Sequence, residues 1–164
     1  MTNMGEAELF NPATLPIGSY NTKLDGSGRV KLPAAVARFL RQFPEDRVFV
    51  TDLGEGFLRI FPLPVWHHNM RVMRANPDLA REAAAVMRMA SNGELVDIDS
   101  QGRIVIPQRL RSDMSWEEGE LRMAGGMGGS IEVFLEADYK ASREQAREVA
   151  KDGLNTLLQR GMQL

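Results

Sequence analysis

Two short stretches of the chain carry the residue types best suited to bind another molecule. They are "LDGSGRVKLP" at residues 24–33 and "IDSQGRIVIP" at residues 98–107. Each has an Asp, two variable residues, a Gly and an Arg, followed by an apolar-rich run and a Pro. An Asp can orient the planar guanidinium of an Arg, which can then hold a phosphate or a guanine edge through two hydrogen bonds. Arg29 and Arg103 are therefore candidate DNA contacts.

The same residues also have a purely structural interpretation. Asp25 with Arg29, and Asp99 with Arg103, could form ion pairs that simply hold two tight turns. An exposed pair of that kind contributes only about 0–1 kcal/mol. Arg rather than Lys in both copies favours bidentate recognition. From the residues alone, both interpretations stay open.

The sequence around each pattern predicts the elements that position it. Asp followed three residues later by Gly indicates a turn, because Asp bonds the backbone ahead of it and Gly accepts a positive φ. The flanking residues alternate between polar and apolar types, which predicts a strand on either side of each turn. Pro33 and Pro107 then each open a short helical segment, and a hairpin follows each helix.

The two stretches belong to a longer internal duplication. An offset of 74 residues relates Arg29 to Arg103, and an offset of 73 relates Phe61 to Phe134. We therefore expect two copies of strand, turn, strand, helix and hairpin. The predicted organisation is a flexible N-terminal arm (1–17), a first repeat (18–64), a helical linker (65–93), a second repeat (94–137) and a C-terminal helix (138–164).

Composition narrows the function classes. The 164-residue chain has no cysteine, which excludes disulfides, thiolate zinc sites and cysteine nucleophiles and fits a reducing cytoplasm. Its N-terminus lacks the features of a signal peptide, and no apolar run approaches the roughly 18 residues of a membrane span. We expect a soluble, cytoplasmic protein that does not act at a membrane.

The charge distribution points to a local basic surface. Formal net charge is −2, which argues mildly against nucleic-acid binding. Residues 18–44, however, contain five Lys or Arg residues and a single Asp, a local charge of +4. Lys31 lies one strand step beyond Arg29 on the same face, and Lys23 precedes the turn. Both lysines are candidate phosphate contacts.

Catalysis has little support in the sequence. His67 and His68 are the only histidines, and neighbours on a helix point about 100° apart, which does not suit a shared metal ion. The stretch "GGMGG" at residues 125–129 lacks the Gly-Lys-Ser/Thr ending of a phosphate loop. We expect no catalytic residue, metal, cofactor or small-molecule substrate.

Beyond these arguments, the sequence resembles the MraZ family of bacterial transcriptional regulators. The two stretches resemble its paired DxxxR motifs, and the likeness spans roughly residues 16–140. Three further stretches match the family: "LRIFPLPVW", "RMASNGELVDID" and "SIEVF".

The resemblance implies a fold and a function. The implied fold is α+β and β-rich: two tandem swapped-hairpin half-barrels of the AbrB type form a pseudo-two-fold β core, with linking and C-terminal helices. MraZ proteins assemble into rings and bind short direct repeats upstream of the division and cell-wall gene cluster. The implied partners are double-stranded DNA and further copies of the chain, in a nucleoid-associated ring of more than four subunits.

The resemblance also assigns roles to the motif residues. It implies that Arg29 and Arg103 contact DNA and that four further residues of the two turns support them: Asp25, Gly28, Asp99 and Gly102. The family often has a Lys where this chain has Ser27 and Gln101. Residues 94–113 also hold four acids against three arginines. We therefore expect the first copy to dominate DNA contact.

Two alternatives remain. One is another AbrB-type, antitoxin-like DNA-binding protein with a protein partner. The other is a ring-forming scaffold in which the repeated turns serve only as ion pairs.

Overall fold

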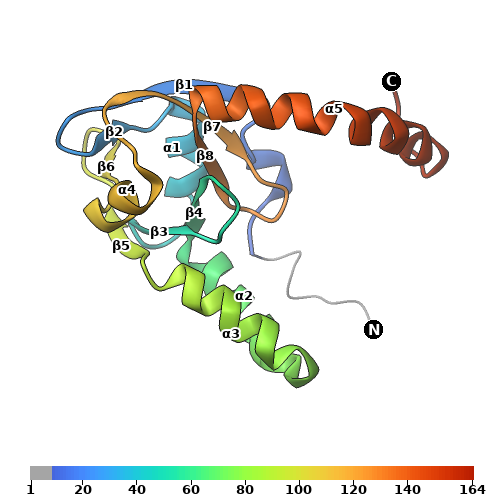
Figure 1. Cartoon of the computed structure of the whole chain (residues 1–164), viewed down its shortest axis with the longest axis horizontal. Coiled ribbons are helices and arrows are strands. Elements are labelled where there is room, and N and C mark those ends of the chain that lie inside the picture. Colours follow the sequence, from blue (N-terminus) through green and yellow to red (C-terminus); the bar gives the residue numbers. More distant parts are fainter. Residues whose placement is uncertain (1–8) are drawn as a thin grey trace.

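A single curled sheet forms the body of the protein. The computed structural model describes residues 9–164, and within this range eight antiparallel strands form a nearly closed barrel (Figure 1). The strand order is β5-β3-β4-β8-β7-β1-β2-β6. Pairs of neighbouring strands from the first half, β3-β4 and β1-β2, are therefore each flanked on both sides by strands of the second half.

The elements follow the duplicated order. The first half contains β1 (Ser19–Leu24), β2 (Arg29–Lys31), α1 (Ala34–Arg41), β3 (Arg47–Asp52) and β4 (Leu58–Pro62). The second half contains β5 (Glu94–Asp97), β6 (Arg103–Val105), α4 (Gln108–Met114), β7 (Gly119–Gly125) and β8 (Ile131–Leu135). Between them lie α2 (Leu63–Ala75), a 3-10 turn (Pro77–Leu79) and α3 (Ala80–Ala90), and α5 (Glu136–Gln159) ends the chain.

Each strand of one half pairs with a strand of the other half. β1 pairs with β7 over six residues, and the equivalent pair is β3 with β5. β2 pairs with β6, and β4 pairs with β8. These four pairings follow a pseudo-two-fold relation, so the predicted fold of interlocked hairpins in a β-rich α+β protein is confirmed.

On the outer surface of the barrel, ion pairs join strands of the first half to strands of the second half. Lys23 in β1 lies opposite Glu120 in β7, with 3.6 Å between Nζ and Oε1. At the equivalent place Arg47 in β3 lies opposite Asp97 in β5, with 3.2 Å between Nε and Oδ1. The basic residue belongs to β1 in one pair and to β3 in the other, so both basic residues come from the first half of the chain.

Alternate side chains along the strands point inward and form one core shared by the two halves of the chain. Ile60 lies opposite Ile131 in the β4–β8 pair, and both side chains are fully buried. Val30 lies opposite Ile104 in the β2–β6 pair, and both are 1% exposed. The core therefore draws on both halves, as expected for repeats of about 70 residues, for which a separate core is marginal.

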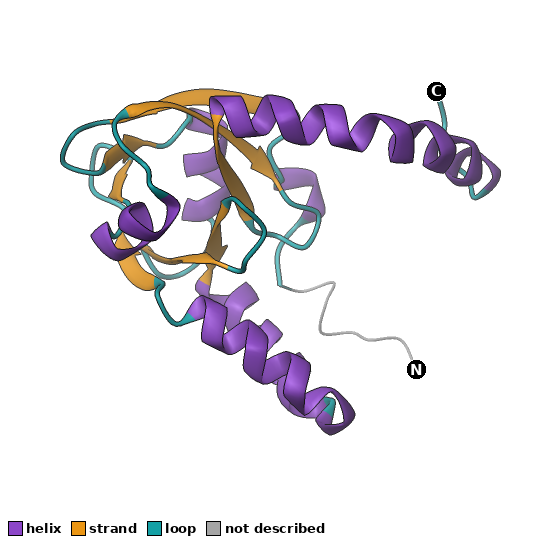
Figure 2. Ribbon diagram, viewed as in Figure 1, coloured by secondary structure: helices purple, strands orange, loops and turns teal. Residues whose placement is uncertain are grey.

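Two aromatic contacts anchor the helices that leave the barrel. Trp66 in α2 packs against Phe61 of β4, with 5.0 Å between ring centroids. Tyr139 in α5 packs against Phe134 of β8, at 5.6 Å. From these equivalent anchors, the α2–α3 hairpin and α5 extend away from different sides of the barrel (Figure 2).

The N-terminal segment contacts the barrel where the structure describes it. Residues 1–8 of the predicted arm lie outside the described residues. In the following segment, Phe10 packs edge-on against Phe39 of α1 at 5.7 Å. Gln42 Nε2 donates a 2.7 Å hydrogen bond to Thr14 Oγ1. Phe10 and Leu15 of this segment are thus packed on the core, whereas Ile17 is exposed.

We predict that Ile60→Ala lowers the free energy of unfolding by about 2–5 kcal/mol, because it leaves a cavity at the β4–β8 contact. The matched control is Ile17→Ala, whose side chain is 90% exposed and which should change stability by at most about 0.5 kcal/mol. Urea unfolding at one protein concentration measures both. Equal losses for the two variants would contradict a core shared at Ile60.

Candidate nucleic-acid interface

The first DxxxR turn is held by its own Asp. The Asp25 backbone N–H donates to Arg29 O and the Gly28 N–H donates to Asp25 O, both at 3.0 Å. Asp25 Oδ1 accepts from the backbone N–H of Ser27 at 2.9 Å and of Arg29 at 2.8 Å. Gly28 has a φ of +88°, as the turn pattern predicts. The turn is therefore closed by backbone and carboxylate together.

The same carboxylate orients the Arg29 side chain. Arg29 Nε lies 3.3 Å from Asp25 Oδ2 and 3.3 Å from Ser27 Oγ, and the arginine side chain is 52% exposed. Within residues 9–164 its terminal nitrogens Nη1 and Nη2 donate no hydrogen bond. The outer edge of the guanidinium is thus free to form a fork of two parallel hydrogen bonds with an external acceptor.

The second turn repeats this geometry. Asp99 Oδ1 accepts from the backbone N–H of Gln101 and of Arg103, each at 2.9 Å. Arg103 Nε donates to Asp99 Oδ2 at 3.0 Å, and Gly102 has a φ of +75°. The Arg103 side chain is 37% exposed, so it offers less surface than Arg29 does.

Both carboxylates are favoured in their charged form. The backbone N–H of Arg29, followed by the Ser27 hydroxyl, lowers the pKa of Asp25 below its ordinary value. The backbone N–H of Arg103, followed by its side chain, lowers the pKa of Asp99. Hydrogen bonds to the anion cause both shifts. Each Asp is therefore a charged support that keeps its Arg oriented.

The β2–β6 pair brings the two turns onto one surface. Arg29 lies opposite Val105, and Lys31 lies opposite Arg103. The residues between them, Val30 and Ile104, are buried, so these four side chains alternate to the outside. We call them the β2–β6 outer face. Three of the four candidate cations thus share one two-stranded ribbon.

Lys23, the fourth candidate cation, has a different setting. It lies beside this face in β1, where its neighbour Leu24 pairs with Val30. Its ammonium is 3.6 Å from the Glu120 carboxylate, and the side chain is highly exposed. The nearby acid offsets part of its charge, so Lys23 is a weaker candidate for phosphate contact than Lys31.

The two copies are not equivalent on the outer face. The position related to Lys31 by the 74-residue offset is Val105, which is exposed. The first copy therefore supplies Arg29 and Lys31, while the second supplies Arg103 alone. The first copy therefore contributes two of the three cations on this face.

Two arginines that the sequence did not single out for this role brace the turns. Arg41 in α1 donates from Nη2 to the Asp99 carbonyl at 2.9 Å, so a helix of the first half holds the turn of the second. Arg111 in α4 donates from Nε to the Ile106 carbonyl at 3.0 Å and packs over Gly28. Their positions on helices gave no signal, because the contacts of Arg41 with Asp99 and of Arg111 with Gly28 join the two halves of the chain.

No metal centre or membrane-spanning element accompanies this face. Across residues 9–164, no group of three or more His, Asp or Glu residues is arranged to hold a metal ion. None of the helices in that range has the length and apolar character needed to cross a membrane.

Comparison with known proteins assigns the family. Residues 89–161 match the sequence profile described as "MraZ protein, putative antitoxin-like". A Transcriptional regulator MraZ of Thermus thermophilus is 31% identical over 147 residues, which cover 88% of this chain and 99% of that protein. The chain belongs to the MraZ family.

Further relatives carry the same name. The Transcriptional regulator MraZ of Marinobacter nauticus is 29% identical, with 76% of this chain and 84% of that protein covered. That of Cupriavidus taiwanensis is 31% identical, with 79% and 88% covered. MraZ proteins are transcriptional regulators, so the expectation that this chain is not an enzyme is confirmed.

We predict that Gly28→Ala destabilises the fold more than Gly102→Ala. Both residues have positive φ, which costs a residue with a Cβ about 1–2 kcal/mol. At Gly28 an added Cβ would lie 2.7 Å from Arg111 Cζ, whereas at Gly102 the nearest atom, Arg41 Nη2, is 4.0 Å away. Displacing Arg111 also loses its bond to Ile106 O, about 0.5–1.5 kcal/mol more.

Urea unfolding measures this difference, and the control repeats both glycine substitutions in an Arg111→Ala background. There the excess cost at Gly28 should vanish, since the obstructing side chain is gone. A difference that persists without Arg111 would contradict the proposed origin.

We predict that acidification weakens the two turns. Because the folded pKa values of Asp25 and Asp99 lie below the unfolded value of about 3.9, their contribution is complete above that pH and is lost as pH falls through the folded values. The Asp25→Asn/Asp99→Asn double variant should lose less stability than wild type between about pH 5 and about pH 2. Urea unfolding across this range tests it, and identical pH slopes would contradict it.

Proposed function

We propose that this protein is a sequence-specific DNA-binding transcriptional regulator that contacts double-stranded DNA through the β2–β6 outer face and its two turns. One observation carries the proposal: each turn fixes the Nε side of an Arg on an Asp and leaves the outer edge of the guanidinium free. Family membership supports the regulatory role.

The chemistry of the face suits a major-groove reader. A two-stranded antiparallel ribbon fits the major groove, and an oriented Arg can form two hydrogen bonds with O6 and N7 of guanine. Lys31, which lies opposite Arg103 and two residues beyond Arg29 on the same face, would neutralise a phosphate. In this arrangement Arg29 and Arg103 read bases or clamp phosphates, and Lys31 and Lys23 add electrostatic attraction. Asp25, Gly28, Asp99 and Gly102 hold the turns.

Assembly would multiply a modest single contact. One subunit offers few cations within a chain of net charge −2, so its affinity at physiological salt is low. A ring of more than four subunits would present the face repeatedly along one duplex, and the effective concentration would raise the overall affinity. Direct repeats upstream of the division and cell-wall gene cluster are the corresponding targets, with the protein associated with the nucleoid.

Two other functions compete with this one. In a scaffold, the turns would serve only as ion pairs, and the net negative charge favours that interpretation. In an antitoxin-like protein, the kind that the family description names, a protein partner would bind in addition to DNA. DNA binding by the turn arginines separates the regulator from the scaffold.

We predict that Arg29→Ala removes the preference for the native site. Fluorescence anisotropy would follow a labelled duplex from the region upstream of the protein's own gene, beside a scrambled duplex, at several salt concentrations. Loss of a bidentate base contact costs about 1–3 kcal/mol of discrimination. Arg103→Ala should cost less, since Arg103 is less exposed and has no neighbouring Lys in its own copy. Lys31→Ala should weaken both duplexes alike and reduce the salt slope by about 0.9.

The controls separate charge from geometry. Arg29→Lys keeps the charge but loses the planar fork, so it should retain salt-dependent binding without discrimination. Arg147→Ala removes an exposed arginine of α5 that pairs with Glu144 and lies off this face, and it should leave binding unchanged. Equal, weak binding to both duplexes, unaffected by any of these substitutions, would overturn the proposal and favour the scaffold.

A further inference from the structure

The two arginines that brace the turns carry more positive charge than bracing requires. Arg41 donates one hydrogen bond, from Nη2 to Asp99 O, and Arg111 donates one, from Nε to Ile106 O. Within residues 9–164 neither guanidinium forms an ion pair with a carboxylate. Each arginine therefore keeps its full charge, and N–H groups that have no partner in this range, beside one of the two turns.

Bracing alone would be served by a neutral side chain. The amide of a Gln can donate to a carbonyl, whereas a charged group that leaves water without a partner costs free energy. Arg111 is half-buried and packs on Gly28, where an added Cβ would lie 2.8 Å from its Nη2. An external anion would complete the environment of this partly desolvated cation.

The internal duplication does not account for these two arginines. The 74-residue offset between the turns relates Arg41 to Ser115. The same offset relates Arg111 to Ala37. Neither arginine is therefore the repeat equivalent of the other.

The two arginines nevertheless occupy similar places in the fold. Arg111, from the second half, packs on Gly28 of the first turn. Arg41, from the first half, bonds the second turn, and its Nη2 would be 4.0 Å from a Cβ added to Gly102. Two different helix positions thus bring a guanidinium to the turn of the opposite half, which indicates a requirement common to both turns.

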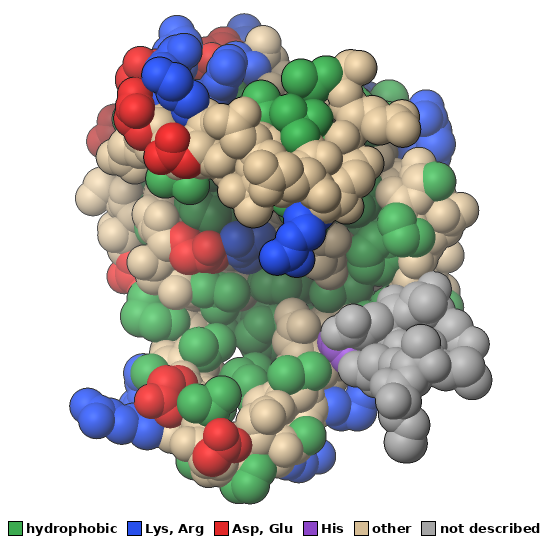
Figure 3. All heavy atoms as spheres, turned by 90° about the vertical axis from the view of Figure 1, so that its right-hand side faces the viewer, with side chains coloured by type: hydrophobic (Ala, Val, Ile, Leu, Met, Phe, Trp, Pro, Cys, Tyr) green, Lys and Arg blue, Asp and Glu red, His purple; other side chains and the backbone are tan. Residues whose placement is uncertain are grey.

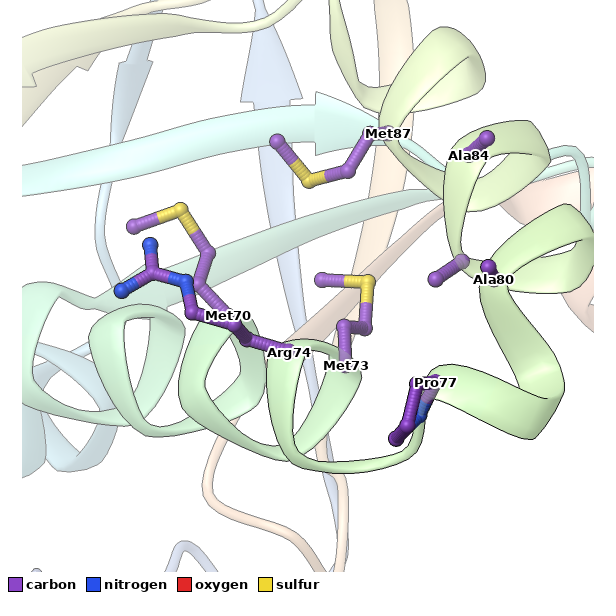
Figure 4. Close-up of a pocket in the computed structure, with 8 residues that line it drawn as sticks. Met70, Met73, Arg74, Pro77, Ala80, Ala84 and Met87 are labelled. Carbon is purple, nitrogen blue, oxygen red and sulfur yellow. The ribbon is translucent and has the colours of Figure 1, made fainter.

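The arginines of the α2–α3 hairpin have a different setting. Arg74 lines an apolar groove of about 410 Å³ together with Met70, Met73 and Met87 (Figure 4). Five large apolar side chains of this hairpin are between 39% and 49% exposed, and Figure 3 shows many hydrophobic side chains on the lower lobe. A phosphate would lose hydration on such a surface, so the arginines beside the turns are better placed to bind one.

We propose that Arg41 and Arg111 bind backbone phosphates of the DNA, so that each turn acts together with a cation from the opposite half. At the first turn, Arg29 would contact a base while Arg111 holds a phosphate. At the second turn, Arg41 would accompany Arg103 in the same way. Phosphate contacts fix the register of a protein on the duplex, and base contacts carry the sequence information. The inference rests on the proposed function and adds two residues to its surface.

The two arginines should not contribute equally. Arg41 is exposed at the last residue of α1. Arg111 is half-buried, and the hollow of about 330 Å³ that it lines is also lined by Glu117 and Glu118. These acids repel a phosphate, so we expect Arg41 to make the stronger contact.

Replacement by Gln separates phosphate binding from bracing, because Gln keeps a donor for the carbonyl and removes the charge. In the anisotropy titration, Arg41→Gln should weaken binding to the native and scrambled duplexes alike and reduce the salt slope by about 0.9. Its affinity deficit should shrink about 3.5-fold as salt rises from about 50 to about 200 mM. Arg111→Gln should change the slope in the same direction by a smaller amount.

The controls distinguish charge from structure. Arg41→Lys and Arg111→Lys keep the charge and should restore the wild-type slope. Arg109→Gln removes a charge from the same helix as Arg111, in a side chain that lines another hollow with Glu94 and Asp113, and should leave the slope unchanged. Loss of the brace alone would reduce discrimination between the duplexes without changing the slope.

An unchanged slope for a Gln variant, or a slope that the matching Lys variant fails to restore, would overturn the assignment for that arginine. These results are read against a wild type that binds, so they leave the roles of Arg29 and Arg103 intact. A wild type without salt-dependent preference for the native duplex would instead overturn the proposed function, and this inference with it.

Discussion

The structure depends on a single hydrophobic core that neither half of the chain completes alone. Neither half of the chain closes a barrel, because each of the four strands in one half takes a hydrogen-bonding neighbour from the other half. Ile60 against Ile131 and Val30 against Ile104 are contacts between halves, not within them. A repeat of this size buries too little apolar surface alone, so exchange of strands is what makes the duplication fold.

The same exchange places the candidate interface. Antiparallel pairing of β2 with β6 sets Lys31 opposite Arg103 and fixes the relative position of two turns that are 74 residues apart in the chain. Arg41 then crosses from the first half to support the second turn. A rigid sheet therefore orients both guanidinium groups, and neither depends on a mobile loop for its direction.

Local chemistry could be predicted from the sequence, and long-range register could not. The turn pattern correctly gave positive φ at Gly28 and Gly102, and the offsets gave equivalent anchors at Trp66 and Tyr139. Strand exchange entered only through the family resemblance, because alternation does not say which strands pair. The roles of Arg41 and Arg111, and the nearness of Glu120 to Lys23, depend on that pairing and had no local signal.

The order of charges in the cross-strand ion pairs has a consequence for how the halves recognise each other. Lys23 lies opposite Glu120, and at the equivalent place Asp97 lies opposite Arg47. If two first repeats associated in the same way, Lys23 would lie opposite Arg47. Two second repeats would set Asp97 opposite Glu120. Like charges directly across a ladder are destabilising. Pairing of two identical halves is thus disfavoured, whereas pairing of a first half with a second half is favoured. The charges at these two ladders therefore select association between unlike halves.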